Sequence, residues 1–390
     1  MTMTKTRRPP LWLRDEPKSG ERRAALTPDA VATLVRAGFE VTVERSEARA
    51  FAAEDYRAAG ARLADAGDWR SAPLEAVIVG LKELDAELGP FTRRHVHFAH
   101  VFKRQQGWRE LLQAFGDGGG QLFDLEYLVD ERGRRIAAFG YWAGYVGAAL
   151  GVLAMAAERR DGAPLSGPLA AWSDRDALLL DVQRAAQALG TNGQGRPPVR
   201  ALVIGASGRS GRGAMDLLRS VGIESTDWER AETASGGPFD AVREHELLVN
   251  CVFVAEPVPP FTTREHLGEP GRRTRAIVDV SCDPFGEANV LPVYRRPTTL
   301  SEPVERLIDA AAGHADPALD LIAIDHLPSL LPRESSEDFC AQLLPALLEL
   351  HGDDDFGHGP FGRAAEVFRR EGDAAMGPPG DADAGHGTPS

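Results

Sequence analysis

Two series of short apolar runs and amphipathic stretches follow one another along the chain. The runs have the length of strands, and the stretches between them carry apolar residues at helical spacing. The first series predicts strands at 9–14, 39–43, 76–80, 97–100 and 121–125, and helices at 28–37, 56–60 and 108–115. Strands that alternate with helices in this way are typical of an α/β domain with a parallel sheet.

Two of these elements are defined most clearly. The helix at 28–37 has Thr27 to cap its first turn, Pro28 at the favoured first position, and Gly38 to end it. The run at 76–80 (AVIVG) is apolar throughout, which is typical of a strand buried on both faces of a parallel sheet.

A second α/β series follows a Gly- and Pro-rich loop at 161–169. A helix is predicted at 175–189, and residues 190–198 (GTNGQGRPP) predict a flexible connector. Further strands are predicted at 200–204, 246–250, 276–280 and 321–324, and further helices at 212–221, 343–350 and 363–370. Residues 371–390 are of low complexity, and we expect a disordered tail there.

One apolar segment is long enough to cross a membrane. Residues 136–157 contain no charge over 22 positions, but most of them are Ala and Gly and the segment is only weakly hydrophobic. We therefore favour a buried helix whose small residues let its neighbours approach closely. The apolar stretch Leu11–Leu13 is far too short for a signal peptide, and no targeting segment is expected.

Composition narrows the possible functions. A chain of 390 residues, 43% hydrophobic and 26% charged, is long enough for two globular domains. Its 58 acidic and 44 basic residues give a net charge of −14, which argues against a general nucleic-acid binder but not against small anions held by a few arginines. The three cysteines (Cys251, Cys282 and Cys340) are too few and scattered for a disulfide scaffold or a zinc site. We expect no metal and a cytoplasmic location.

The segment 199–211 (VRALVIGASGRSG) joins a strand to a helix through a glycine-rich turn. Gly205 and Gly208 permit a tight turn and the approach of backbone N–H groups to a pyrophosphate, and Gly211 lets the helix pack against the strand. The spacing G-x-x-G-x-x-G differs from the commoner G-x-G-x-x-G, and an ordinary turn of an α/β sheet is the alternative.

An acidic residue supports the dinucleotide interpretation. Glu229 lies about 20 residues beyond the turn, where a carboxylate can accept hydrogen bonds from an adenosine ribose and repel a 2′-phosphate. This favours NAD over NADP, although the neighbouring Arg230 is the kind of residue that NADP sites use.

Candidate catalytic and anion-binding residues follow the strands of the first series. Lys82 comes directly after the strand at 76–80, and His100 ends the strand predicted at 97–100. A lysine at such a position can lose solvation, acquire a lowered pKa and act as a base. The arginines at 132, 134 and 135 predict either a charged hairpin turn or a carboxylate clamp. Taken singly, each of these residues is more typical of a structural or solvated role than of a catalytic or binding one.

Six segments together resemble a known family. They are GERRAALTP, VGLKEL, HFAHVFKRQQGW, DLEYLVDERGRRIAAFGYWAGYVGAALG, GASGRSGRGAMDLL and IDHLPSLLPRESS, in this order between about Leu13 and Leu350. They resemble the lysine-forming, NAD-dependent saccharopine dehydrogenases, which belong to the wider alanine dehydrogenase and transhydrogenase fold group.

The resemblance implies a fold and a reaction. The fold is α/β, with two Rossmann-like domains of parallel sheets and an active-site cleft between them. The first domain is discontinuous (1–138 and 327–370, the substrate domain) and the second (139–326) binds NAD. The reaction is the reversible oxidation of saccharopine, followed by hydrolysis of the imine to L-lysine and 2-oxoglutarate. From the resemblance together with the composition, we expect a cytoplasmic monomer that acts on small molecules and binds neither nucleic acid nor membranes.

The resemblance also assigns roles to residues. Lys82 is the base and His100 the acid and base of the hydration steps. The implied substrate contacts are Arg23, Lys82, Gln105, Arg135 and Phe139. The implied charges that tune the lysine are Glu83, Lys103, Glu126 and Asp325. The implied NAD contacts are Arg134, Gly205, Gly208, Arg209, Gly211, Glu229, Thr233, Phe253, Val280, Ile324, Asp325, His326 and Leu327.

The chain departs from the family at three positions. Glu229 and Phe253 stand where members can have aspartate and tyrosine, and Ser210 stands where some have cysteine, so no disulfide with Cys251 is expected. Two other functions stay open: another NAD-dependent opine or amino-acid dehydrogenase on this scaffold, and a non-catalytic NAD-binding protein.

Overall fold

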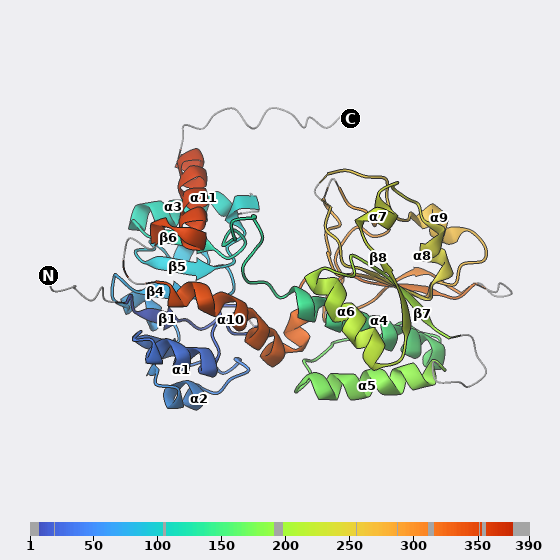
Figure 1. The fold of residues 1–390 in the computed structure, drawn as a ribbon, viewed down its shortest axis with the longest axis horizontal. Helices are drawn as coiled ribbons and strands as arrows, with labels where there is room; N and C mark the ends of the chain where they lie inside the picture. Colours follow the sequence, from blue (N-terminus) through green and yellow to red (C-terminus); the bar gives the residue numbers. More distant parts are fainter. Residues whose placement is uncertain are drawn as a thin grey trace. The chain divides into compact units, whose positions relative to one another are not determined.

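The computed structural model describes residues 8–18, 20–103, 107–190, 198–254, 256–286, 288–310, 316–350, 352 and 356–376. The chain divides into two compact units, Met1–Ala138 with Ser336–Ser390, and Phe139–Ser335. Figure 1 shows both units with their labelled elements. The chain passes from the first unit to the second at 138/139 and returns at 335/336, within one helix, α10 (Pro332–Leu348).

The first unit contains a six-stranded parallel sheet. Its strands are β1 (Leu11–Leu13), β2 (Val41–Glu44), β3 (Arg62–Ala64), β4 (Val77–Val79), β5 (Arg94–His97) and β6 (Gln121–Asp124). Its helices are α1 (Pro28–Arg36), α2 (Ala53–Ala58), α3 (Trp108–Gly118), α11 (Gly359–Met376) and the short 3-10 helices η1 (Asp68–Ser71), η2 (Ala86–Leu88) and η3 (Val101–Lys103). The side chain of Thr27 caps α1 by accepting a hydrogen bond from the N–H of Ala30, as predicted.

The strand order of the first sheet is β3-β2-β1-β4-β5-β6. This is the doubly wound order of Rossmann-like folds, in which the direction of winding reverses between β1 and β4. Ligands of such sheets bind beyond the carboxyl ends of the strands at that reversal. The residues that follow β1 and β4 are therefore the first place to look for a site in this unit.

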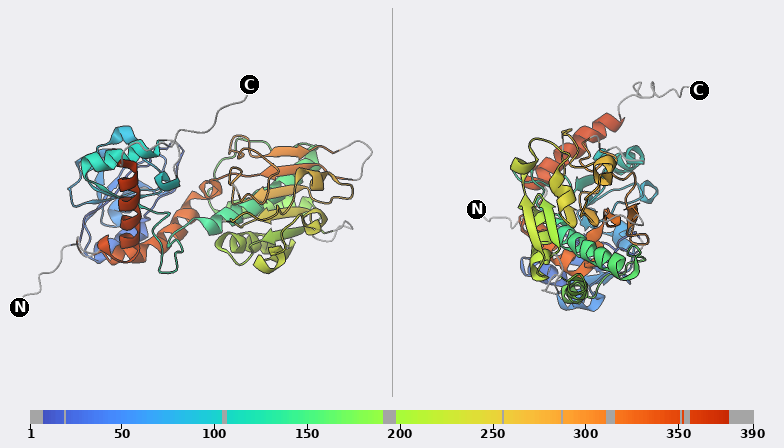
Figure 2. Two further views of the ribbon diagram at one scale, coloured as in Figure 1. Left: turned by 90° about the horizontal axis from the view of Figure 1, so that it is seen from above. Right: turned by 90° about the vertical axis from the view of Figure 1, so that its right-hand side faces the viewer.

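Helices from both ends of the chain's first unit cover its sheet. Leu111, Leu112 and Phe115 of α3 pack with Ile78 and Leu122 in one apolar cluster. Helix α11 lies beside α3 and β6 (Figure 1), and the left view of Figure 2 shows it again beside α3. The core of this unit thus needs residues that are more than 200 positions apart in the sequence.

The second unit contains another six-stranded sheet. Its strands are β7 (Arg200–Ile204), β8 (Glu224–Trp228), β9 (Leu247–Asn250), β10 (Ala276–Asp279), β11 (Glu305–Ile308) and β12 (Leu319–Ile322). Its helices are α4 (Gly140–Asp161), α5 (Arg175–Ala188), α6 (Arg209–Ser220), α7 (Arg230–Thr233), α8 (Asp240–Glu244), α9 (Arg264–Gly268) and η4 (Leu327–Leu330). The order is β11-β12-β10-β9-β7-β8, and all pairs are parallel except β11 with β12.

Alternate residues of these strands point to opposite faces of the sheet. Ala201 and Val203 of β7 join the apolar cluster of α4, α5 and α6, and Leu202 and Ile204 join that of α8 and α9. Both faces are buried, which is why the strands are apolar throughout. The sheet reverses its winding between β7 and β9, and the glycine turn follows β7.

Helix α4 is the central helix of the second unit. It is long and apolar enough to cross a membrane, yet 72% of its most apolar 18-residue stretch is buried inside the protein. Its glycines permit the predicted close approach: a Cβ on Gly144 would lie 1.7 Å from the carbonyl oxygen of Ser210 in α6, and one on Gly213 of α6 would lie 1.9 Å from that of Tyr141. The buried helix is the better interpretation of residues 136–157.

Several predicted elements are corrected by the structure. The strand expected at 97–100 lies at 94–97, so His100 follows the strand instead of ending it. Strands β3, β8 and β11 were not predicted, and the strand expected at 321–324 lies two residues earlier. Helix α10 begins at Pro332 and not at 343, and α11 runs from 359 to 376 and not from 363 to 370.

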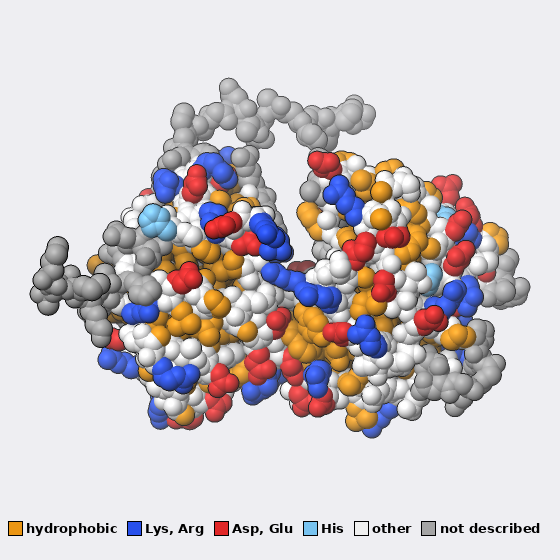
Figure 3. All heavy atoms as spheres, in the orientation of Figure 1, with side chains coloured by type: hydrophobic (Ala, Val, Ile, Leu, Met, Phe, Trp, Pro, Cys, Tyr) orange, Lys and Arg blue, Asp and Glu red, His pale blue; other side chains and the backbone are white. Residues whose placement is uncertain are grey.

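The boundaries of the units differ from the predicted domains at one place. Residues 327–335 belong to the second unit, because η4 packs against α4 and Ser335 hydrogen-bonds the carbonyl oxygen of Pro328. The connector expected at 190–198 lies mostly outside the described residues, as does the part of the tail from 377 to 390. On the visible face of each unit, Lys and Arg side chains lie among Asp and Glu (Figure 3).

Candidate active site

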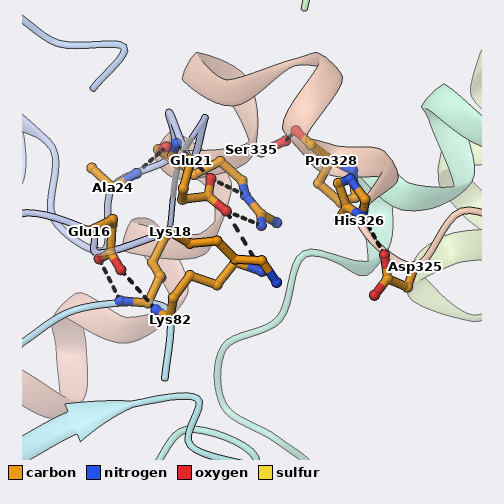
Figure 4. A network of polar contacts seen from close by, with 12 residues as sticks. Glu16, Lys18, Glu21, Ala24, Lys82, Asp325, His326, Pro328 and Ser335 are labelled. Carbon is orange, nitrogen blue, oxygen red and sulfur yellow. Dashed lines mark hydrogen bonds and ion pairs between the residues drawn. The ribbon is translucent and has the colours of Figure 1, made fainter. Parts of the chain in front are cut away.

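Lys82 lies at the carboxyl edge of the first sheet, three residues past the end of β4 and beside the reversal between β1 and β4. Its side chain is 19% exposed, and its Nζ lies 3.7 Å from Oε2 of Glu21. Figure 4 shows the two side chains facing each other. Lys82 therefore occupies the position in which sheets of this order present functional groups.

Glu21 is held by Arg23. The guanidinium of Arg23 donates hydrogen bonds from Nε to Oε1 at 2.8 Å and from a terminal nitrogen to Oε2 at 2.6 Å, and its backbone N–H donates to Oε1 at 2.9 Å. Both side chains are almost fully buried, at 3% and 6% exposure. Bidentate pairs of this kind fix the orientation of both partners. Glu21, which the sequence analysis did not identify, is thus shared between two cations.

Burial lowers the pKa of Lys82, and the positive charge of Arg23 lowers it further. Glu21 acts in the opposite direction without cancelling these effects. Burial raises the pKa of Glu21 itself, but the hydrogen bonds and charge of Arg23 outweigh it, so that this pKa is lowered and the carboxylate stays charged. The site therefore combines a lysine that releases its proton more easily than usual with a fixed anion beside it.

The three carboxylates expected to surround Lys82 are dispersed. Glu83 forms an exposed ion pair with Lys18 at 3.8 Å and raises the pKa of Lys82 less than Glu21 does. Glu126 contacts His100 instead, and Asp325 belongs to the second unit, where it hydrogen-bonds Nδ1 of His326. The side chain of Lys103 lies outside the described part of the chain.

His100 has an unusual backbone. Its φ is +57°, a left-handed conformation that few non-glycine residues adopt. Its N–H donates to Oδ2 of Asp124 at 3.1 Å, and its ring stacks on Phe98 with 6.1 Å between the ring centroids. Asp124, at the end of β6, also accepts the N–H of Glu126 at 2.9 Å. One buried carboxylate thus holds the backbone of both His100 and Glu126.

Asp124 is fully buried, and burial raises its pKa to about 7. The backbone N–H groups that donate hydrogen bonds to its carboxylate lower the pKa, but by less. The side chains of His100 and Arg135 both contact the carboxylate of Glu126. Its Oε1 lies 3.6 Å from Nδ1 of His100 and 3.7 Å from a guanidinium nitrogen of Arg135. His100, Glu126 and Arg135, all expected from the sequence, therefore form one cluster.

The arginine turn has the geometry of a hairpin. Val129 pairs with Arg135 across it, and the side chain of Arg134 bonds the carboxylate of Asp130 at 3.0 Å while 69% exposed. Phe139 caps the start of α4 and is half-buried. Gln105 lies outside the described residues.

The glycine turn of the second unit is built as its sequence predicts. Gly205 has a φ of +82°, Gly208 is the N-cap residue of α6, and a Cβ on Gly211 would lie 2.1 Å from the carbonyl oxygen of Gly205. Helix α6 begins at Arg209, three residues earlier than predicted, so Gly211 lies inside its first turn. A helix N-terminus reached through close backbone contacts is suited to bind a pyrophosphate.

Glu229 lies beside this turn. It follows β8, and its carboxylate accepts the N–H of Ser207 in the turn and caps α7 together with Glu232. The carboxylate thus stands at the place where a ribose acceptor is needed next to a pyrophosphate turn.

Apart from Arg134, which belongs to the first unit, the other expected NAD contacts lie at the carboxyl edge of the same sheet or near it. Arg209 opens α6, and Phe253 follows β9 with 71% of its side chain exposed. Val280 follows β10, and residues 324–327 follow β12. Thr233 ends α7, and its hydroxyl donates to the carbonyl oxygen of Glu229 at 3.2 Å. The residues present fit a dinucleotide.

The structure shows neither disulfides nor a metal site in the residues it describes. Cys251, Cys282 and Cys340 are free thiols, and burial raises the pKa of Cys282 to about 12 and that of Cys340 to about 11. Within the described ranges, no three His, Cys, Asp or Glu side chains gather as metal ligands would.

Comparison with known proteins decides the family. Residues 12–146 match the family described as alanine dehydrogenase/PNT, N-terminal domain. A saccharopine dehydrogenase [NAD(+), L-lysine-forming] of Neurospora crassa is 44% identical over 92% of this chain and 95% of its own length. The chain belongs to this family. The resemblance inferred from the six segments is confirmed.

Solved structures agree on the fold. An L-alanine dehydrogenase superposes with a TM-score of 0.60 over 87% of this chain and 89% of its own, at 20% identity. A transhydrogenase from Sinorhizobium meliloti superposes with a TM-score of 0.57 over 86% and 91%, at 15% identity. These values confirm the predicted α/β class with two mostly parallel sheets, and the family is one of NAD-dependent oxidoreductases.

Proposed function

We propose that the protein catalyses the reversible, NAD-dependent cleavage of L-saccharopine to L-lysine and 2-oxoglutarate. The single observation that carries the proposal is the lysine of lowered pKa beside Glu21 and Arg23 in a chain of this family. When bound, NAD supplies the acceptor for the hydride that leaves the glutamate-side carbon of the substrate.

Lys82 takes the proton from the secondary amine of saccharopine. Its burial favours the neutral amine that this step requires, and Glu21 stabilises the ammonium that results. Arg135 is suited to a carboxylate of the substrate, since guanidinium groups bind carboxylates in a bidentate manner. Arg23, whose guanidinium already binds both oxygens of Glu21, is proposed as a further substrate contact. Gln105 and Phe139 complete the proposed substrate contacts.

His100 serves the later steps as acid and base. Water adds to the substrate imine, and the carbinolamine then breaks down, and both steps need a proton carrier near neutral pH. The contact of His100 with Glu126 keeps a carboxylate at its ring, and Asp124 fixes its backbone. Glu83, Lys103, Glu126 and Asp325 are proposed to adjust the charge around these groups.

The second unit is proposed to bind NAD rather than NADP. Gly205, Gly208, Gly211 and Arg209 are suited to the pyrophosphate, and Glu229 to the ribose, where its charge disfavours a 2′-phosphate. Arg134, Thr233, Phe253, Val280 and residues 324–327 are the further proposed contacts. We also infer a cytoplasmic monomer without nucleic-acid or membrane partners, which agrees with the net charge of −14 and the free thiols.

The decisive test is the oxidation of NADH with defined substrates. We expect activity with 2-oxoglutarate and L-lysine, and none with pyruvate and ammonia. NADPH in place of NADH should lower kcat/KM by at least about tenfold, because the carboxylate of Glu229 repels a 2′-phosphate and a tenfold change corresponds to only about 1.4 kcal/mol. Activity with other amines but not with lysine would overturn the substrate assignment.

A further inference from the structure

A buried ion pair between Arg14 and Glu16 holds the loop that carries Lys82. Neither the sequence analysis nor the family match assigned a role to these two residues. Arg14 follows β1 and Gly80 follows β4, and the two strands lie side by side with Leu13 opposite Val79. The guanidinium of Arg14 is 1% exposed and lies 3.2 Å from Oε2 of Glu16, whose side chain is 6% exposed. The pair therefore lies at the carboxyl ends of β1 and β4, where the sheet reverses its winding.

Both partners bind the backbone around Lys82. Oε1 of Glu16 accepts the N–H of Leu81 at 2.7 Å, and Oε2 accepts the N–H of Lys82 at 2.9 Å. Arg14 donates from its other terminal nitrogen to the carbonyl oxygen of Lys82. The backbone N–H of Lys82 thus bonds one member of the ion pair, Glu16, and its carbonyl oxygen bonds the other, Arg14. Figure 4 shows the contact between Glu16 and Lys82.

The packing leaves this arrangement little freedom. A Cβ on Gly80 would lie 2.5 Å from Cζ and Nε of Arg14, so a side chain at this position would displace the guanidinium. Arg14 also donates to the carbonyl oxygen of Asp15 at 3.1 Å, and Arg49 donates to that of Arg14 at 3.0 Å. Because charge-assisted bonds in a buried site resist displacement, the pair can hold its position better than a loop alone.

We propose that Arg14 and Glu16 are positioning residues that hold Lys82 in reach of Glu21 and of the substrate amine. This inference rests on the proposed function, in which Lys82 is the base. If the ion pair had only a structural role, its loss would lower the stability of the fold. It would not shift the pH profile of the reaction or lower kcat in a stable variant.

The test compares Glu16→Gln and Glu16→Asp with the exposed control Glu75→Gln in the full-length enzyme. Glu16→Gln keeps the shape but replaces one acceptor oxygen with an NH2 group, and Glu16→Asp keeps the charge but is one methylene too short to reach both N–H groups. We expect kcat for saccharopine oxidation to fall by about tenfold to 100-fold, since displacements of about 1 Å have such effects. The KM for NAD should change less than about twofold, as the dinucleotide turn is far along the chain in the other unit.

A second readout separates positioning from stability. If the loop is released, Lys82 gains solvent, its pKa rises, and the acidic limb of the kcat/KM profile moves to higher pH. Wild-type kcat and an unmoved limb in both Glu16 variants would overturn the inference. If Glu16→Gln does not fold, Glu16→Asp alone decides between these results.

Lys82→Met shows which of the two proposals fails. Full activity of Lys82→Met would overturn the proposed function, whatever the Glu16 variants do. Loss of activity in Lys82→Met with unchanged Glu16 variants would overturn only the positioning role.

Discussion

Nζ of Lys82 lies 3.7 Å from Oε2 of Glu21, a carboxylate that also accepts two side-chain hydrogen bonds from Arg23. Because Arg23 engages both oxygens, Glu21 offsets only part of the cost of burying the ammonium. The pKa of Lys82 therefore stays below its ordinary value. This sharing of one anion between two cations underlies the first two predictions.

Replacement of Lys82 should abolish proton abstraction without affecting the dinucleotide turn. Lys82→Met is expected to lower kcat for saccharopine oxidation by about 10²- to 10⁴-fold, the usual contribution of a general base. Lys82→Arg should be equally slow, since arginine keeps the charge but does not lose its proton near neutral pH. NADH binding, followed by fluorescence titration, should be unchanged in both. Wild-type turnover of Lys82→Met across pH 6–9 would contradict the assignment.

Removal of the negative charge at Glu21 should lower the pKa of Lys82 further, because Glu21 raises it in the wild type. In Glu21→Gln, the acidic limb of kcat/KM for saccharopine oxidation should therefore move to lower pH. Arg23 loses its bidentate partner at the same time, and the KM for saccharopine should rise by about tenfold, as expected for a lost charged hydrogen bond. The pH profile and the KM are measured beside Glu75→Gln. A limb that moves to higher pH would refute this account.

His100 can be replaced without disturbing its backbone. Asparagine adopts the left-handed conformation more readily than other residues, so His100→Asn should keep the φ of +57° and the melting temperature. Loss of the proton carrier should lower steady-state turnover by about 10²-fold. Because His100 acts after the oxidation, a single-turnover burst of NADH should remain. Loss of this burst would place His100 in the oxidation step instead.

The stability of the protein should decrease below pH 6.5 because of a buried histidine. His95 is fully buried among Trp69, Phe91 and Phe115, and burial lowers its pKa to about 3. The ordinary pKa of histidine, 6.5, applies to His95 in the unfolded chain. Between pH 6.5 and pH 3 the unfolded chain therefore binds a proton at this residue that the folded chain does not, so the free energy of unfolding falls as pH falls. At pH 5 the cost is about 2 kcal/mol, from 1.36 kcal/mol per pKa unit.

His95→Phe should remove this term. The loss of unfolding free energy between pH 7.5 and pH 5.0, from urea titrations, should be smaller by about 2 kcal/mol than in the wild type. Asp124, with a pKa raised to about 7, acts in the opposite direction over pH 4–7 but equally in both proteins, so it cancels. The exposed His358→Phe is the control, and an equal effect of both variants would contradict the prediction.

The contact between α4 and α6 should not tolerate a methyl group. Gly144→Ala places Cβ 1.7 Å from the carbonyl oxygen of Ser210, so the backbones must separate, and we expect a loss of about 3 kcal/mol or more. Gly372→Ala in α11, where no atom lies within 4 Å of the added carbon, should be neutral or stabilising by up to about 1 kcal/mol. Equal melting temperatures of the two variants would show that α4 and α6 can adjust.

The predicted elements were most accurate where apolar runs are pure. Strands β4, β7 and β9 and the capped helix α1 lie within two residues of their expected places. β5 was displaced because its buried residues include His95 and His97, which resemble surface residues in a sequence. β8 and β11 were missed because they lie at sheet edges and have few apolar residues.

The candidate site could be predicted only in part. Lys82 and the glycines were candidates because they follow recognisable apolar strands. His100 was a candidate at the end of a predicted strand that in the structure ends at His97. Glu21 and Glu16 were not, because their contacts with Lys82 join segments about 60 residues apart and depend on the strand order β1-β4. The reversal that brings these segments together is a property of the whole sheet and not of any local pattern.

The origin of the first unit in two distant segments bears on how the protein is made. The ring of Phe123 in β6 packs against those of Phe356 and Phe361, with 5.4 and 5.3 Å between ring centroids. The ring of Phe115 packs against that of Phe368, with 5.8 Å between centroids. On the ribosome, the aromatic partners of Phe115 and Phe123 emerge only after the entire second unit has been translated, a delay of roughly tens of seconds at ordinary rates of synthesis. Until then the nascent chain presents uncovered aromatic rings, and a chaperone that shields them would raise the yield of folded enzyme.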